Sequence, residues 1–139
     1  MIENLEIDIK VPNQTRYLSL IGKIGEDIAR TLKRYRGDRE ELAYQVNLVL
    51  TEATSNAILH ASENDNQLIH INIAIINQNL RIQVYDHGKG FDPKSLPNPD
   101  FQELKESGRG VYIIQTIMDK VNCNRIKGGH VLEMIKYLH

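Results

Sequence analysis

Cysteine is almost absent from this sequence: Cys123 is the only one in 139 residues. A single thiol excludes a disulfide within the chain and a zinc site built from cysteines, and it is typical of proteins in a reducing compartment. Because no residue near Cys123 resembles an activating base, a structural role is the simpler interpretation.

Long apolar runs and an excess of charge of one sign are also absent. No run approaches the roughly 18 apolar residues of a membrane-spanning helix, and residues 1–4 lack the pattern of a signal peptide. The formal net charge is −1, so no strong field favours nucleic acid or an acidic membrane surface. We therefore expect a cytoplasmic protein that binds neither nucleic acid nor membranes directly.

One local cluster of positive charge stands out against this neutral background. It consists of Arg30, Lys33, Arg34 and Arg36, near the end of a segment with helical spacing. Cationic side chains at the C-terminal end of a helix complement its dipole. We interpret the cluster as the solvated end of a helix.

Alternation of apolar and polar residues predicts five strands, because successive side chains of a strand point to opposite faces. The alternating segments are 5–11, 69–75, 80–86, 121–127 and 131–138. Asn77-Gln78-Asn79 predicts a tight turn that joins the second and third strands as an antiparallel hairpin. Gly128-Gly129 predicts the turn between the last two strands.

Helical spacing of apolar residues predicts three helices. The first covers 17–35 with Gly37 as a candidate end, the second covers about 38–61, and the third opens at Gly108. This order of elements predicts an α+β fold, a two-layer sandwich in which three helices cover one face of a mixed, mostly antiparallel sheet. We expect residues 1–139 to form a single domain.

The third predicted strand ends in an acid. The residues on its core face are Leu80, Ile82, Val84 and Asp86. A buried carboxylate needs a hydrogen-bonding partner, and glycines at Gly88 and Gly90 let a ligand come close to the backbone. The pattern predicts a pocket in which Asp86 binds the polar edge of a small molecule.

A polar stripe follows the second helix, with Glu52, Asn56 and His60 four residues apart. The neutral amide oxygen of Asn56 suits Mg²⁺, which prefers oxygen ligands. A glutamate one turn earlier can take a proton from an attacking hydroxyl. Such a stripe is also typical of a solvated helix face, and a histidine at a helix end often only satisfies a local carbonyl.

Gly108-Arg109-Gly110 marks the start of the third helix, where free amides and the helix dipole bind phosphate. A plain junction between a loop and a helix has the same pattern. The sequence contains neither a Walker loop nor a dinucleotide-binding fingerprint. Before the helix lies the proline-containing segment 92–107, and a long irregular loop of this kind is typical of a functional lid or of disorder.

Together these three elements resemble the ATP-binding motifs of the GHKL (histidine kinase-like) ATPase superfamily. Residues 52–61, Glu-Ala-Thr-Ser-Asn-Ala-Ile-Leu-His-Ala, look like the first motif of the anti-sigma factor serine/threonine kinases. Residues 108–114, Gly-Arg-Gly-Val-Tyr-Ile-Ile, look like the last motif of the same family. The similarity extends over almost the whole chain.

The resemblance implies a role for each motif residue. Asn56 would hold a Mg²⁺ ion that bridges the phosphates of ATP, and Glu52 would act as the base toward the acceptor serine or orient it. Asp86 would accept a hydrogen bond from the adenine amino group. The remaining assignments are room beneath the base at Gly88 and Gly90, phosphate contacts from Gly108, Arg109 and Gly110, and a lid over 92–107.

The resemblance also implies a function: an ATP- and Mg²⁺-dependent serine/threonine kinase that acts as an anti-sigma factor. It would bind a sigma factor and phosphorylate an anti-sigma factor antagonist, and it could form a homodimer through the first strand and the first helix. A non-catalytic ATP-binding switch that captures protein partners is the main alternative. The catalytic domain of a histidine kinase and an ATP hydrolase that drives conformational change are further alternatives.

Two positions depart from the pattern of the superfamily. Leu59 stands three residues after Asn56, where many members carry a basic residue that reaches phosphate. His130 follows Gly129, where many members have a threonine near the adenine-binding acid. The first departure removes a positive charge near the phosphates, and the second removes a hydroxyl contact near the base.

Overall fold

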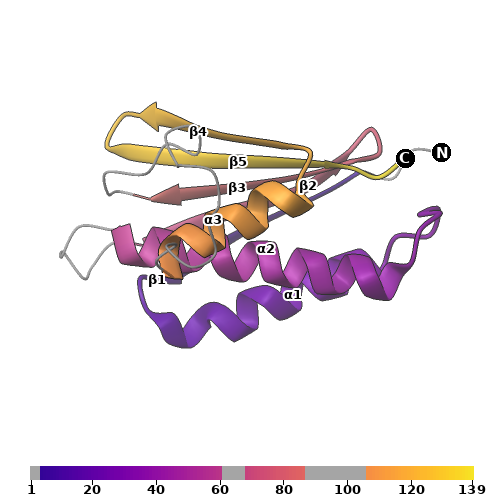
Figure 1. The fold of residues 1–139 in the computed structure, drawn as a ribbon, viewed down its shortest axis with the longest axis horizontal. Coiled ribbons are helices and arrows are strands. Elements are labelled where there is room, and N and C mark those ends of the chain that lie inside the picture. The colour runs from indigo at the N-terminus through magenta and orange to yellow at the C-terminus, as the bar shows by residue number, and fades with distance from the viewer. Residues whose placement is uncertain (1–3, 61–67, 87–105) are drawn as a thin grey trace.

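The computed structural model describes residues 4–60, 68–86 and 106–139, without the side chains of His60 and of residues 106–109. This part of the chain forms five strands, three α-helices and a short 3-10 helix (Figure 1). In chain order the elements are β1 (Leu5–Pro12), η1 (Thr15–Tyr17), α1 (Leu18–Arg30), α2 (Arg39–His60), β2 (Leu68–Ile76), β3 (Asn79–Asp86), α3 (Glu106–Ile117), β4 (Lys120–Ile126) and β5 (Gly129–Tyr137).

The strands form one sheet with the order β1-β2-β3-β5-β4. All four pairings between the described strands are antiparallel, so the sheet expected to be mixed is antiparallel throughout this part of the chain. Asn77 and Gln78 link β2 to β3 with φ angles of 52° and 66°. Two consecutive positive φ angles are what a type I′ hairpin turn needs, which confirms the predicted tight turn.

The three helices lie on one side of the sheet, which confirms the predicted two-layer α+β architecture (Figure 1). α2 packs between α1 and α3 and also contacts β2 and β3. α1 approaches α2 closely at Gly25, where a β-carbon would lie 2.8 Å from Val46 Cγ1. Among the described residues, no helix has both the length and the apolar character needed to cross a membrane.

The first helix ends earlier than its apolar spacing predicts. α1 stops at Arg30, and the Thr31 hydroxyl donates a hydrogen bond of 2.6 Å to the Ile28 carbonyl. Leu32, which is 6% exposed, and Tyr35 still pack against the core from the turn that follows. The apolar spacing over 17–35 therefore indicates which residues contact the core. These contacts continue beyond the residue at which the helix ends.

Candidate functional site

Asp86 is the last residue of β3, and its side chain is buried. Along β3 the burial alternates strictly, with Leu80, Ile82 and Val84 on the helix-facing side. Asp86 continues this register and is only 7% exposed. The structure confirms that the core-facing side of this strand ends in a carboxylate.

Glu52 and Asn56 lie one turn apart on α2, as predicted. Their neighbours Ala53 and Ala57 are buried in the core, and Asn56 itself is 3% exposed, whereas Glu52 is half-buried. This polar stripe is therefore not a solvated helix face. A buried amide such as that of Asn56 requires polar partners. His60 is the last residue of α2, and its side chain lies outside the described part of the structure.

Gly110 of α3 lies directly against the two polar residues of α2. A β-carbon at Gly110 would overlap with Glu52 Oε2 and would lie 3.6 Å from Asn56 Nδ2. Glycine is the residue type that allows such a close approach. The contact brings together two motifs that are more than fifty residues apart in the sequence.

α3 begins at Glu106, so Gly108-Arg109-Gly110 lies inside the helix and does not open it. Gly110 is the fifth residue of α3, and a backbone N–H beyond the first four of a helix is directed at a carbonyl of the same helix. The contribution of Gly110 is therefore the space left by its missing side chain, whereas Gly108 remains in the first turn.

The three predicted elements lie at one end of the molecule. The end of β3, the C-terminal half of α2 and the start of α3 are all found there (Figure 1). Asp86 faces the helix layer to which Glu52 and Asn56 belong. This arrangement is the one that the predicted pocket requires, although binding of a ligand by these side chains remains a prediction.

Several predicted site residues fall outside the described part of the chain. They are Gly88, Gly90, the side chain of Arg109 and most of the expected lid over 92–107. Their assignments to the nucleotide therefore also remain predictions.

The structure also locates the two departures from the superfamily pattern. His130 is the register partner of Asp86 across β3 and β5. Directly opposed residues of antiparallel strands share one face, so the substitution of histidine for threonine lies beside the buried acid. Leu59 is 66% exposed near the end of α2. The pairing of His130 with Asp86 depends on strand register, and sequence spacing alone does not determine that register.

Comparison with known proteins identifies the family. The family model described as the histidine kinase-like ATPase domain matches residues 13–136. The chain belongs to the histidine kinase-like ATPase domain family. The match includes α2, β3 and α3 and therefore all of the predicted motif residues.

Curated relatives within this family carry the names expected from the motifs. An anti-sigma F factor of Anoxybacillus flavithermus is 34% identical over 100 residues, which are 68% of this chain and 68% of the relative. The serine-protein kinase RsbW of Bacillus cereus is 29% identical over 147 aligned positions, covering 99% of this chain and 89% of the relative. The RsbW protein of Bacillus licheniformis is 29% identical over 143 positions, covering 96% and 86%. These relatives confirm the resemblance inferred from the sequence.

Solved structures support the same fold. The histidine kinase domain of a blue-light activated histidine kinase from Erythrobacter litoralis matches with a TM-score of 0.55 and 20% identity over 92% of this chain. A second structure of that kinase matches with a TM-score of 0.55 and 19% identity. The present chain covers 62% of the first solved structure and 42% of the second.

The contact between Gly110 and Glu52 predicts that the effect of alanine at position 110 on stability depends on residue 52. Alanine is favoured over glycine inside a helix by about 0.5–1 kcal/mol. In the unaltered protein, however, Gly110→Ala is expected to lose this gain, because the new methyl group must displace the Glu52 carboxylate. Urea unfolding monitored by circular dichroism measures both effects.

In a Glu52→Ala background the same Gly110→Ala change is expected to be neutral or stabilising, because the overlapping carboxylate is gone. Two residues in contact should show such a coupling in a double-mutant cycle. Equal effects of Gly110→Ala in both backgrounds would show that α3 and α2 do not meet at these positions.

Proposed function

We propose that this protein is an ATP- and Mg²⁺-dependent serine/threonine kinase that acts as an anti-sigma factor. The observation that carries the proposal is the close approach of Gly110 to Glu52 and Asn56, together with the buried carboxylate of Asp86 on the helix-facing side of β3. Membership of the histidine kinase-like ATPase family and relatives named as serine-protein kinases and an anti-sigma factor support it.

Nucleotide recognition depends on Asp86. A buried carboxylate accepts hydrogen bonds but donates none when ionised, so it selects a base that presents a donor at its polar edge. The 6-amino group of adenine is such a donor, whereas guanine presents an oxygen acceptor at the same position. The motif resemblance assigns Gly88 and Gly90 to the space beneath the base, and Gly108 and Arg109 to the phosphates.

Phosphate transfer requires a group that receives the proton of the attacking hydroxyl. Glu52 is half-buried and lies one turn from Asn56 on the C-terminal half of α2, against Gly110 of α3. Glu52 accepts the proton as the serine oxygen bonds to the γ-phosphorus, and the bond to the leaving ADP oxygen breaks. Most of the rate comes from positioning and electrostatic stabilisation, as in other phosphoryl transfers.

The donor set fits Mg²⁺. The described residues contain no group of three or more His, Cys, Asp or Glu side chains that could hold a metal ion by themselves. Asn56 supplies a buried amide oxygen, and Mg²⁺ is a cation that is commonly held by few protein ligands together with phosphates and water. When bound, Mg²⁺ neutralises charge on the phosphates, and Asn56 is the residue that would hold it.

The partners follow from the same proposal. The kinase captures a sigma factor, and it phosphorylates a serine or threonine of an anti-sigma factor antagonist, which releases the antagonist. These events take place in the cytoplasm. A second copy of the chain is a further partner, with β1 and α1 as the proposed surfaces.

The decisive experiment incubates the protein with γ-labelled ATP, Mg²⁺ and the antagonist protein encoded nearest to it. Label transferred to a serine or threonine of the antagonist, identified by mass spectrometry, supports the kinase. Tight ATP binding without transfer to the antagonist would instead indicate a non-catalytic switch that captures partners. The absence of ATP binding would overturn both interpretations.

A further inference from the structure

Only one member of the basic cluster noted in the sequence, Arg30, belongs to the end of a helix. α1 ends at Arg30, so Lys33, Arg34 and Arg36 lie beyond it, on the turn that leads to α2. Complementing the dipole of α1 therefore explains only Arg30. With Arg39 at the start of α2, segment 31–39 carries four cationic side chains and one acid.

Arg30 is engaged within the protein. It forms an ion pair of 3.0 Å with Glu40 and one of 3.3 Å with Glu26. Asp38, the acid of the segment, is also engaged, because its Oδ1 accepts the backbone N–H of Glu40 at 2.9 Å. This is the N-cap geometry that starts a helix.

Arg34 and Arg36 are left without such partners. Both are exposed, and neither takes part in an ion pair or a hydrogen bond with any residue in the part of the chain that the structure describes. Their charges are therefore directed to solvent, next to the exposed Lys33.

The turn that presents these charges is anchored in the core. Leu32 is 6% exposed and Tyr35 packs against the core, so buried and cationic positions interleave along the turn. The Tyr35 ring lies over Gly37, where a β-carbon would be 2.7 Å from the Tyr35 hydroxyl oxygen. Arg39 donates a hydrogen bond of 2.8 Å to the Lys33 carbonyl and closes the turn. These contacts fix the backbone that carries the cations, which lowers the entropic cost of binding.

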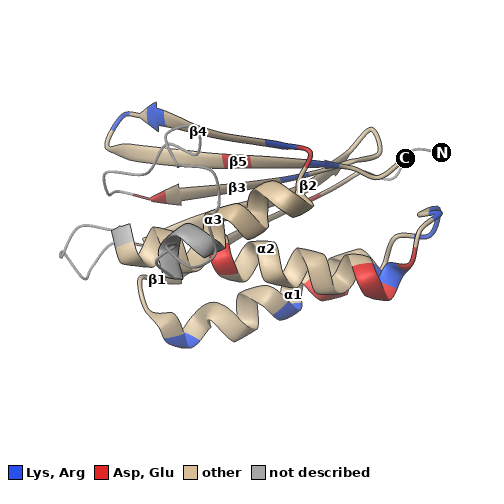
Figure 2. Cartoon of the chain, in the orientation of Figure 1, with Lys and Arg blue, Asp and Glu red and all other residues tan. Residues whose placement is uncertain are grey.

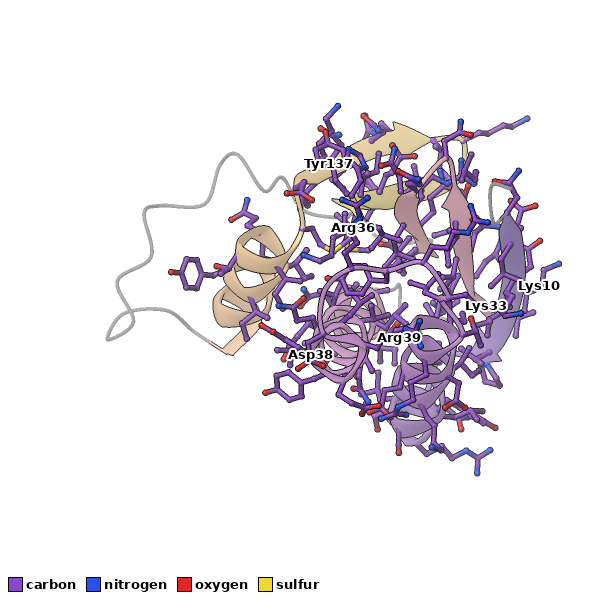
Figure 3. The ribbon with its side chains drawn as sticks, turned by 90° about the vertical axis from the view of Figure 1, so that its right-hand side faces the viewer. Lys10, Lys33, Arg36, Asp38, Arg39 and Tyr137 are labelled. Carbon is purple, nitrogen blue, oxygen red and sulfur yellow. The ribbon has the colours of Figure 1, made fainter. Side chains whose placement is uncertain are left out.

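The basic turn lies far from the proposed nucleotide site. Lys and Arg gather on it at the end of the molecule opposite to the end of β3 (Figure 2). Figure 3 looks onto this end and shows Lys33, Arg36 and Arg39 on its surface. A ligand bound here would therefore leave the nucleotide site accessible.

The number of cationic side chains on the basic turn decides which class of ligand fits. The electrostatic part of nucleic-acid binding grows with the number of phosphates that cationic side chains neutralise, which is about 6–10 in a protein whose binding is strongly salt-dependent. Four cations on a chain with a net charge of −1 are too few. An acidic peptide segment needs only two or three charge-assisted contacts, and arginine binds a carboxylate through two parallel hydrogen bonds.

We infer that the turn formed by residues 31–39 is a docking site for an acidic segment of a protein partner, with Arg34 and Arg36 as its main contacts. The site is independent of nucleotide binding. It therefore gives the protein a second contact with a partner, separate from the surface near Glu52 at which a phosphoacceptor must arrive.

The test measures binding of fluorescein-labelled decaglutamate to the full chain by fluorescence anisotropy at low salt. The double variant Arg34→Glu/Arg36→Glu is expected to weaken binding by about tenfold or more, because attraction becomes repulsion. The matched control is Arg125→Glu/Lys127→Glu, which makes the same charge change at the same spacing on the exposed end of β4 and the turn that follows it. The control is expected to retain the affinity of the unaltered protein.

The neutral variant Arg34→Gln/Arg36→Gln is expected to lose less affinity than the charge reversal, and decaglutamine is expected not to bind. Equal losses in the reversal and control variants would show non-specific attraction and overturn the inference. Tighter binding of a short DNA duplex than of decaglutamate, lost in the same variant, would assign the turn to nucleic acid and overturn it as well. ATP affinity, measured in parallel, tests the proposed function separately and is expected to stay unchanged in the two Arg34/Arg36 variants.

Discussion

Replacement of Glu52 by alanine is expected to lower the rate of phosphate transfer to a serine by about 10²- to 10⁴-fold, the range that a positioned general base contributes. ATP affinity is expected to change little, because the residues assigned to nucleotide binding, Asn56 and Asp86, keep their positions. Single-turnover transfer of labelled phosphate measures the first quantity, and isothermal titration calorimetry measures the second.

Two further variants separate proton transfer from packing. Glu52→Gln keeps the size of the side chain that lies against Gly110, but its amide cannot accept the proton. Its transfer rate is therefore expected to be as low as that of Glu52→Ala. Glu41→Ala removes an exposed carboxylate from the first turn of the same helix and is expected to be fully active. Full activity of Glu52→Gln would remove Glu52 from the role of base.

Local sequence patterns were sufficient to predict the features of the fold that depend on neighbouring residues. β3 alternates because one of its faces is buried under the helices, and that same alternation placed Asp86 on the core side. The turn at Asn77-Gln78 was predictable for a similar reason, since asparagine readily adopts a positive φ angle. Both features depend on a few consecutive residues.

Apolar spacing alone did not reveal where the first helix ends. Leu32 is buried and Tyr35 is half-buried on a turn, at positions where a continued helix would also bring them to the core. The end of α1 is instead marked by a side-chain hydrogen bond, from Thr31 to the Ile28 carbonyl, which competes with further helical bonding. For this reason the interpretation of the basic cluster as a helix end holds for Arg30 alone.

Contacts between distant segments were beyond the reach of sequence patterns. The position of β5 between β3 and β4 places His130 opposite Asp86, and the packing of α3 on α2 places Gly110 against Glu52. Neither contact has a local signal, because each depends on how separate elements pack. The motif resemblance named the residues of the candidate site, and only the fold shows which of them meet.

The role of Asp86 leads to a prediction about base selectivity. Asp86→Asn replaces a carboxylate by an amide of nearly the same size at a position that is 7% exposed. A hydrogen bond to a charged group contributes about 1.5–3 kcal/mol, so ATP affinity is expected to fall by about ten- to a hundredfold. GTP is expected to lose less affinity or to gain some, because the asparagine NH₂ can donate to the guanine oxygen.

Calorimetric titration of the unaltered protein and of Asp86→Asn with ATP and GTP measures this change of selectivity. Asp8→Asn is the matched control, since it makes the same substitution on the exposed side of β1, where Asp8 accepts a hydrogen bond from Asn72. Its ATP affinity is expected to equal that of the unaltered protein. Thermal unfolding distinguishes recognition from structure: a loss of stability that accounts for the loss of ATP affinity would make Asp86 a structural residue. An unchanged preference for ATP over GTP would place the base elsewhere in the protein.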